Sequence, residues 1–157
     1  MTVVAIGSKL SLFLLNLEQE SMAMYTIFVN LMVILIGSFF TVRSFKQANR
    51  DSNLKDDVKH GMKTTTAFAL MLSLFVLIYY NFIDTHYFPN MIESRVELAR
   101  QALAENPDID LENVRRTGET MFSPSTHATI TLFGLTVVGG VYTFIIALVM
   151  RKIPGFR

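Results

Sequence analysis

The stretch Thr64–Ile83 reads TTTAFALMLSLFVLIYYNFI and contains no charged residue. About 20 apolar residues in an α-helix cross the hydrocarbon core of a bilayer, which is roughly 30 Å thick. Two further stretches, Ser21–Val42 and Thr120–Met150, are also free of charged residues. The three stretches predict an all-α integral membrane protein built as a helical bundle.

The composition agrees with this class. The chain has 157 residues, of which 51% are hydrophobic and 17% are charged, and its net charge is +1. A soluble domain has closer to about 25% charged residues. The length favours a single domain over residues 1–157. The sequence has no Cys, which excludes a disulfide framework, a thiol nucleophile and a thiolate metal site.

A further apolar segment, residues 2–17, is interrupted by Lys9. A Lys at the centre of a membrane helix costs roughly 2.5–3.5 kcal/mol on an insertion scale. We interpret the segment as a short or tilted first membrane helix; the alternatives are an interfacial helix and the remnant of a longer helix that starts upstream. A signal peptide is disfavoured because the start lacks basic residues. The sequence thus predicts four transmembrane helices, or three if this segment does not cross, at residues 2–17, 22–43, 63–84 and 125–150.

The charge distribution predicts the orientation. The segment Arg43–Lys63 holds six basic and three acidic residues, and the tail holds Arg151, Lys152 and Arg157 without an acid. The segment Asp84–Phe122 holds eight acids and four Arg. Lys and Arg in short loops mark the cytoplasmic side. We therefore expect a multi-pass protein with cytoplasmic N- and C-termini and with the acidic segment outside.

The acidic segment is predicted to be a helical insert over residues 88–122. Apolar residues recur with helical spacing in Asn90–Asn106, which indicates an amphipathic helix. Asp110 is a suitable N-cap for a second, short helix, and Ser123-Pro124 is a suitable start for the last membrane helix. We therefore expect an extracytoplasmic helical hairpin between the last two spans.

Small and hydroxyl residues recur on one face of each span. In lipid, such faces let helices approach closely. We favour the interpretation that each face builds the bundle; the alternative is that one of them binds a partner's helix. The residues predicted to bind a partner are Thr136, Gly140 and Thr143 in the last span, and Arg95, Glu97, Arg115 and Arg116 in the insert.

No residue pattern indicates chemistry. Asp84, His86 and His127 are weak candidates for a metal site, since imidazole and carboxylate suit zinc, but residues of these types more often cap helix ends or face lipid headgroups. We expect no metal, no cofactor and no catalytic residue. The last three spans have no ionisable side chain, of the kind that marks ion pathways, between their ends.

The order of features resembles a family of small bacterial inner-membrane proteins, domain-of-unknown-function family 4199, which is common in Bacteroidota. The resemblance depends on Tyr25–Lys46, which ends in Val42-Arg43-Ser44-Phe45-Lys46, on Gly61, and on Tyr79-Tyr80-Asn81-Phe82. It covers most of the chain. Segment 2–17 departs from the family pattern, whose first span is usually fuller. The resemblance implies a fold and an inner-membrane location, and it implies no activity.

These observations favour a non-catalytic accessory or structural subunit of a larger inner-membrane complex. Its expected partners are other membrane protein subunits and membrane lipid, not nucleic acid. The alternative is a small lipid or small-molecule transporter, or a lipid-binding membrane protein, that works as an oligomer. Such a protein would need a polar cavity, for which the candidates are Asn30, Thr66, Asn81 and Thr129. A third, weaker hypothesis is an enzyme that uses Asp84, His86 and His127.

Overall fold

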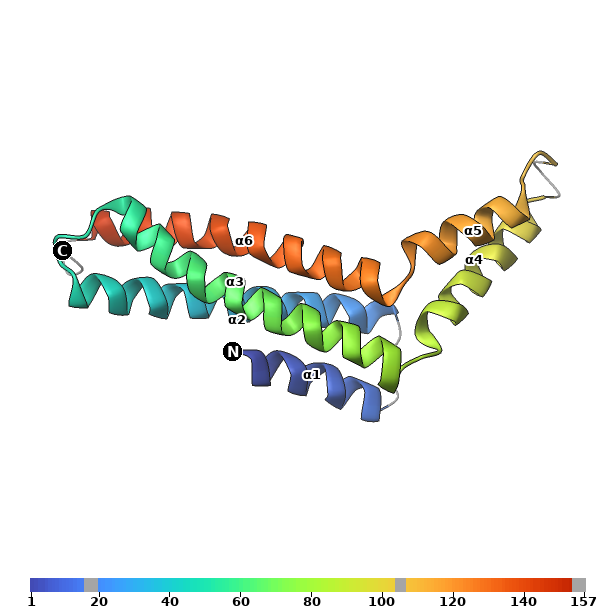
Figure 1. The fold of residues 1–157 in the computed structure, drawn as a ribbon, viewed down its shortest axis with the longest axis horizontal. Coiled ribbons are helices and arrows are strands. Elements are labelled where there is room, and N and C mark those ends of the chain that lie inside the picture. Colours follow the sequence, from blue (N-terminus) through green and yellow to red (C-terminus); the bar gives the residue numbers. More distant parts are fainter. Residues whose placement is uncertain (16–19, 104–106, 154–157) are drawn as a thin grey trace. The chain divides into compact units, whose positions relative to one another are not determined.

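A computed structural model describes residues 1–15, 20–103 and 107–153, without the side chains of residues 20–23 (Figure 1). These residues form six α-helices and one π-helical segment, and none of them forms a strand. The prediction of an all-α protein is therefore confirmed. By their contacts, the residues divide into two compact units, which are Met1–Leu72 with Thr131–Arg157, and Ser73–Ile130.

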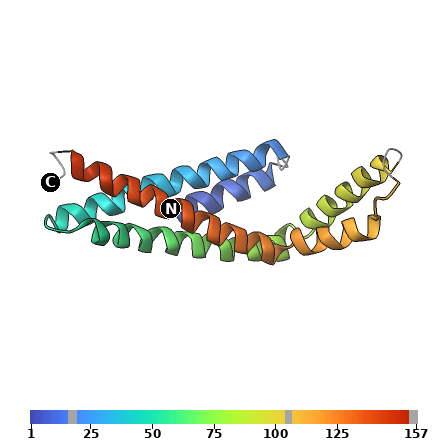
Figure 2. The same ribbon diagram turned by 90° about the horizontal axis from the view of Figure 1, so that it is seen from above.

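The first unit contains α1 (Thr2–Leu14), α2 (Glu20–Ala48) and parts of α3 (Leu54–Ile78) and α6 (Pro124–Lys152). In both views α1 lies alongside α2 (Figures 1 and 2). Asn53 begins α3, because its Oδ1 accepts a hydrogen bond from the Asp56 amide at 2.9 Å. This is the usual role of an N-cap side chain.

Three helical stretches are long and apolar enough to cross a membrane, namely Met24–Ala48, Leu54–Ile83 and Pro124–Lys152. They overlap the last three of the four predicted spans, at residues 22–43, 63–84 and 125–150. The helix α1 has 13 residues and is therefore about 20 Å long at a rise of 1.5 Å per residue. This is shorter than the roughly 30 Å hydrocarbon core. The structure supports a multi-pass membrane protein with three spans, and a fourth span over residues 2–17, of which 16 and 17 lie outside the described residues, stays a prediction.

Small residues bring α2, α3 and α6 close together in the first unit. A Cβ added to Gly61 would overlap the Thr143 methyl group and would lie 2.9 Å from the Val42 side chain. One turn further along, a Cβ added to Gly139 would lie 2.7 Å from the Thr65 Cβ. There is no room for a side chain at either position, so the helices can approach this closely only because both residues are glycine. Helix packing in the unit therefore follows the small-residue mode that is typical of membranes.

Apolar side chains fill the space beside this close contact. Val42, Ile146, Ala147 and Met150 form a buried cluster from α2 and α6. Partly buried apolar side chains surround it: Leu35, Leu54, Val58 and Tyr142. Other apolar side chains of the same helices, such as Phe40, Leu70 and Phe133, are exposed, as expected of surfaces that face lipid.

The second unit contains the end of α3, the π-helix η1 (Tyr79–Ile83), α4 (Tyr87–Ala102), α5 (Leu111–Met121) and the start of α6. In η1 the Asp84 amide donates to the Tyr79 carbonyl at 3.0 Å, which is the i to i+5 spacing of a π-helix. The sequence analysis did not predict this segment. Single π-turns within α-helices are frequent at functional sites.

The helices α4 and α5 form the predicted hairpin between two spans. Asp110 caps α5, since its Oδ1 accepts from the Glu112 amide at 3.0 Å and the Asn113 amide at 3.2 Å. Ser123 caps α6 in the same way, from the Thr126 amide at 3.2 Å, and Pro124 is the first helical residue. Both predicted caps are confirmed. The predicted first helix of the insert begins three residues earlier than expected, at Tyr87, and its predicted end at Asn106 lies outside the described residues.

Candidate functional site

The hairpin of α4 and α5 has its own internal contacts. The Arg115 Nη2 donates to the Glu93 Oε2 at 3.0 Å, which joins α5 to α4. A Cβ added to Gly118 would lie 3.3 Å from Ile92, so the two helices are in close contact at this glycine. These contacts show that the connection between two spans is a packed element rather than an extended loop.

The charged residues predicted to contact a partner lie on this hairpin. Arg95 lies over the Phe122 ring, with 5.6 Å between the guanidinium carbon and the ring centroid. Glu97 accepts a hydrogen bond from Arg100 at 2.8 Å, and both side chains are about half exposed. Arg115 is held by Glu93, as described above, and Arg116 is exposed. These side chains are on the surface of the hairpin, and their binding to another protein stays a prediction.

An apolar side chain is also exposed on the hairpin. Leu98 lies on α4 beside Glu97 and is 59% exposed. Single exposed leucines are common on protein surfaces. Its neighbours Glu97 and Arg100 on the helix are charged and exposed. Leu98 was not singled out from the sequence, because it lies two residues after the buried Val96 and so falls outside the apolar face of the helix.

The small-residue face of the last span, also predicted to bind a partner, lies largely against its own chain. Thr143 is fully buried and contacts the position of Gly61 in α3. A Cβ added to Gly140 would lie 3.1 Å from the sulfur of Met62, which is also in α3. The Thr136 hydroxyl donates to a carbonyl of its own helix, at Leu132. These positions agree with the favoured interpretation that the face builds the bundle, and docking of a partner's helix there stays a prediction.

A cluster of charged side chains joins the ends of α2, α3 and α6. The Arg151 guanidinium donates from Nε and Nη2 to the Asp57 Oδ2 at 3.0 and 2.7 Å. The Ser52 hydroxyl donates to the Asp57 Oδ1 at 2.6 Å, and the Ser52 carbonyl accepts from Arg151 at 2.6 Å. The Lys46 ammonium donates to the carbonyls of Ser52 and Arg50 at 3.1 and 3.2 Å. We call Lys46, Ser52, Asp57 and Arg151 the polar clamp.

Burial makes the clamp unusual for a surface loop. The Asp57 side chain is 1% exposed, the Lys46 side chain 8% and the Arg151 side chain 30%. Charges buried to this extent are tolerated only when hydrogen bonds satisfy them, as they do here. The Lys46 nitrogen also lies 4.0 Å from the Asp57 carboxylate. The clamp therefore fixes one end of three membrane-crossing helices to one another.

Sequence analysis missed the clamp because it interpreted Arg43–Lys63 as an orientation signal with solvated side chains. Helical spacing was the available clue. Asp57, Gly61 and Thr65 lie four residues apart, on one face of α3. An acid in line with the small residues of a packing face is expected to be buried. Its partner Arg151 is 94 residues away, and no local pattern connects the two.

The weak metal candidates do not assemble a metal site in the described residues. No group of three or more His, Asp or Glu side chains there could hold a metal ion. His127 instead contacts the Tyr80 ring edge to face, with centroids 5.4 Å apart. Tyr80 also contacts Tyr87 and Phe88, at 4.9 and 4.7 Å, in an aromatic cluster of the second unit. Asp84 and His86 lie beside this cluster in the sequence.

Two of the four polar side chains proposed for a transport cavity bond to their own helices. The Asn81 amide donates to the Leu77 carbonyl at 2.7 Å, and the Thr129 hydroxyl donates to the Ser125 carbonyl at 2.8 Å. The Asn30 Oδ1 differs, since it is buried without a hydrogen-bond partner among the described residues. Transport stays a prediction.

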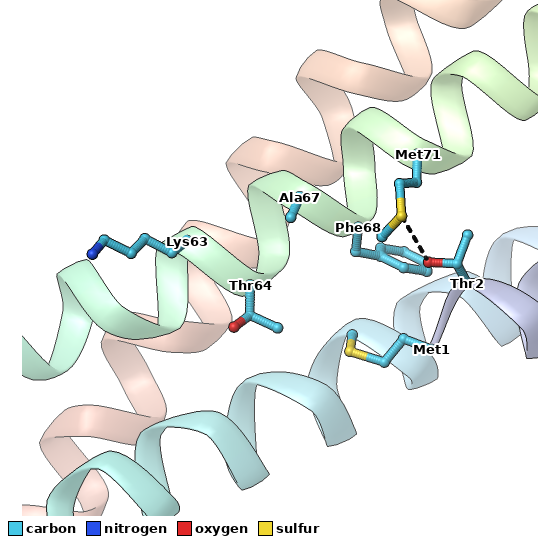
Figure 3. A pocket seen from close by; sticks show the side chains of 7 residues that line it. All are labelled: Met1, Thr2, Lys63, Thr64, Ala67, Phe68 and Met71. Carbon is cyan, nitrogen blue, oxygen red and sulfur yellow. Dashed lines mark hydrogen bonds between the residues drawn. The ribbon is translucent and has the colours of Figure 1, made fainter.

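A pocket of about 420 Å³ opens in the first unit between the start of α1 and one side of α3 (Figure 3). Its wall is mainly apolar, and a hydrogen bond between the Thr2 hydroxyl and the Met71 sulfur, 3.9 Å long, lies at one end. The lining residues are Met1, Thr2, Lys63, Thr64, Ala67, Phe68 and Met71.

Comparison with known proteins identifies a family. The profile of a family described as "Protein of unknown function (DUF4199)" matches residues 1–152 of the chain. No curated protein and no solved structure matches it significantly.

Proposed function

We propose that this chain, which belongs to the DUF4199 family of proteins of unknown function, acts as a non-catalytic accessory subunit of a larger membrane-protein complex. In this proposal the three long helices anchor the subunit in the bilayer. The hairpin of α4 and α5 recognises the extramembrane part of another subunit.

The hairpin is the observation that carries the proposal. Two membrane helices can be joined by a connection of about 2–8 residues. Here the connection between η1 and α6 contains two helices, joined by the Glu93–Arg115 ion pair and the close contact at Gly118. The connection is therefore a folded element and not a simple turn. Because its contacts are internal, the hairpin offers a preformed surface, which lowers the entropy cost of binding.

The surface of the hairpin suits a protein partner. Leu98 offers an exposed apolar side chain, and Arg95, Glu97 and Arg116 offer charges on the same hairpin. Arginines are enriched among the residues that contribute most of the binding energy at protein interfaces, and the rims of interfaces are polar. We assign the partner's contact to this surface rather than to the buried Thr143.

The location is part of the proposal. Lys55 and Lys152 belong to the basic ends of α3 and α6, and basic loops mark the cytoplasmic side of a bacterial inner membrane. The hairpin follows the opposite ends of these spans and would then face the outside. Its partner would be a protein with an extracytoplasmic surface.

Copurification with matched variants tests the proposal. The full chain is extracted from native membranes in mild detergent, isolated through a tag, and its companions are quantified by mass spectrometry. We expect a stoichiometric membrane protein to copurify. The substitutions Leu98→Ser and Arg116→Ala should reduce its recovery at least several-fold, because each removes an exposed contact of the hairpin.

The control is Lys55→Ala, which also removes one exposed cation but lies outside the hairpin. Its companion should be recovered as with the wild type. An equal loss with Lys55→Ala and Arg116→Ala, or the isolation of the chain alone under conditions that preserve other membrane complexes, would contradict the proposal.

A further inference from the structure

The hairpin of α4 and α5 has two sides, one on each flank of the contact between its helices. Successive side chains of a helix are rotated by about 100°, so the residues before and after a buried position lie on opposite flanks. In α4 the buried Val96 separates Arg95 from Glu97. In α5 a buried glycine separates Thr117 from Glu119 in the same way.

One ion pair shows which flanks of the two helices share a side. Arg115 of α5 donates to Glu93 of α4. Arg115 lies four residues before Glu119, and Glu93 lies four residues before Glu97, so each pair is on one flank of its helix. We call this flank of the hairpin the Glu119 side and the opposite flank the Thr117 side.

The two sides differ in charge. On the Glu119 side, helical spacing places the charged residues Glu93, Glu97, Arg100, Arg115 and Glu119. On the Thr117 side, it places Arg95 together with the uncharged residues Ile92, Ala99, Val114, Thr117 and Met121. Met121 is 62% exposed. A helix surface that faces water is usually polar and charged, whereas the core of an interface is depleted in charged residues. The asymmetry indicates that another molecule covers the Thr117 side.

Arg95 is the only charged residue beside the contact on the Thr117 side of the described hairpin. Its guanidinium carbon lies 5.6 Å from the centroid of the Phe122 ring. Arg95 is exposed and forms no ion pair within the described part of the chain, whereas Arg100 and Arg115 of the Glu119 side each have an acidic partner. A cation of this kind is complementary to a carboxylate on a partner.

We propose that the Thr117 side binds an amphipathic helix of another membrane protein, with apolar side chains against Ala99 and Val114 and a carboxylate at Arg95. A helix that packs along two antiparallel helices completes a three-helix bundle, and an amphipathic helix bound by its apolar face is a recurrent mode of recognition. The inference rests on the proposed accessory function and narrows its contact to one side of the hairpin.

Charge argues against two other occupants of the Thr117 side. In a two-fold symmetric contact between copies of the chain, the same surface of both copies meets. Such a contact would bring two Arg95 side chains together without an acid of the Thr117 side to separate them. Helices that bind a bilayer surface are rich in Lys and Arg, whereas this side has a single Arg.

Thiol labelling tests whether the Thr117 side is covered, since the chain contains no Cys. Thr117→Cys and Glu119→Cys place a thiol at equivalent exposed positions on the two sides. Each variant is labelled with a maleimide in native membranes that have been broken open, and in liposomes of the same lipids that hold only the purified chain. We expect Thr117→Cys to react at least about ten-fold more slowly in the native membranes, because only molecules with an open contact react. Glu119→Cys should react equally in both.

Substitution of Arg95 in the Thr117→Cys chain tests the carboxylate. Arg95→Gln leaves the partner's carboxylate without its counter-ion and should raise the labelling rate in native membranes towards the rate in liposomes. Arg95→Lys retains the charge and should keep most of the protection. Arg100→Gln is the matched control, because it removes an exposed Arg of the Glu119 side, and it should leave the protection unchanged. Circular dichroism of each purified variant verifies that the helices are folded.

Equal labelling rates of Thr117→Cys in native membranes and in liposomes would overturn the proposal, since the side would then be open or covered by lipid alone. A disulfide-linked dimer of Thr117→Cys in the liposomes would assign the side to a second copy of the chain. Protection that Arg95→Gln does not reduce would contradict the carboxylate. A companion that copurifies with the chain while Thr117→Cys stays reactive would reject this inference and leave the accessory function standing. Isolation of the chain without any companion would contradict both.

Discussion

At the scale of single residues, Asp57 is the most constrained side chain of the first unit. Both of its carboxylate oxygens accept hydrogen bonds, from Ser52 and from Arg151, and Lys46 lies 4.0 Å away. Removing one partner of a buried ion pair leaves the other charge uncompensated, which costs more than the pair itself contributes. We therefore expect a large loss of stability when Asp57 alone is neutralised. Replacing the whole clamp by apolar side chains would cost less.

We expect Asp57→Asn to lower the free energy of unfolding by about 3–5 kcal/mol, because Arg151 and Lys46 would lose their counter-ion in a buried site. Titration of the purified protein from mild detergent into sodium dodecyl sulfate, followed by circular dichroism, measures the change. Asp51→Asn is the control, since Asp51 is exposed, and it should stay within about 0.5 kcal/mol of the wild type. Similar losses for both variants would show that burial of Asp57 has no energetic consequence.

At the scale of the elements, the contact between α3 and α6 depends on two glycines in successive turns. Gly61 faces Thr143, and Gly139 faces Thr65, so each helix presents one glycine to a threonine of the other. In lipid there is little hydrophobic drive between helices, and close packing supplies most of the association. A side chain added at either glycine must therefore separate the helices or displace the threonine.

The two kinds of glycine in these helices give a matched prediction. Gly61→Ala should destabilise the protein by about 1–3 kcal/mol, the usual cost of overpacking, because its new Cβ would overlap Thr143. Gly134→Ala should be neutral or slightly stabilising, since nothing lies within 4 Å of its added Cβ and Ala is the better helix former. Detergent unfolding of the two variants in parallel measures both. Equal stability of the two variants would show that α3 and α6 can separate without cost.

Local chemistry explains which elements could be predicted from the sequence. The spans follow from charge-free stretches, and the starts of α5 and α6 follow from Asp110 and Ser123, whose side chains bond to amides two or three residues away. The π-helix could not be predicted, because Tyr79–Ile83 has the same apolar character as the α-helix before it. Likewise, the face of α6 that packs on α3 is centred on Gly139 and Thr143 rather than on Thr136, and this depends on a neighbour 70 or more residues away.

At the scale of the whole molecule, some candidate sites could be predicted from the sequence and others could not. The charged residues of the hairpin could be proposed as candidates from the sequence, because an amphipathic helix shows its polar face there. The polar clamp and the pocket were not found, because each combines residues from helices that are distant in the sequence. Sequence patterns therefore indicated exposed polar residues, whereas the structure was needed to identify the buried polar residues.

The topology can be tested on the intact chain, which contains no Cys. We expect Glu112→Cys to react with a membrane-impermeant maleimide in intact spheroplasts, and Lys55→Cys and Lys152→Cys to react only after lysis. The reason is the proposed topology, in which α3 and α6 each cross the bilayer once, so that their basic ends share one side and the hairpin lies on the other. Gel-shift labelling of each single-Cys variant measures this. Labelling of Lys55→Cys and Lys152→Cys from opposite sides would contradict two crossings.

The polar clamp also has a consequence in time. Arg151 follows Asp57 by 94 residues, and chains grow at about 5–20 residues per second, so Arg151 is synthesised roughly 5–20 s after Asp57. Until then the nascent chain holds Asp57 with Ser52 and Lys46 alone, and the ends of α2 and α3 have no third helix to meet. The hydrogen bonds between Asp57 and Arg151 can form only after α6 has been synthesised. The order of translation therefore sets when the ends of α2, α3 and α6 become joined.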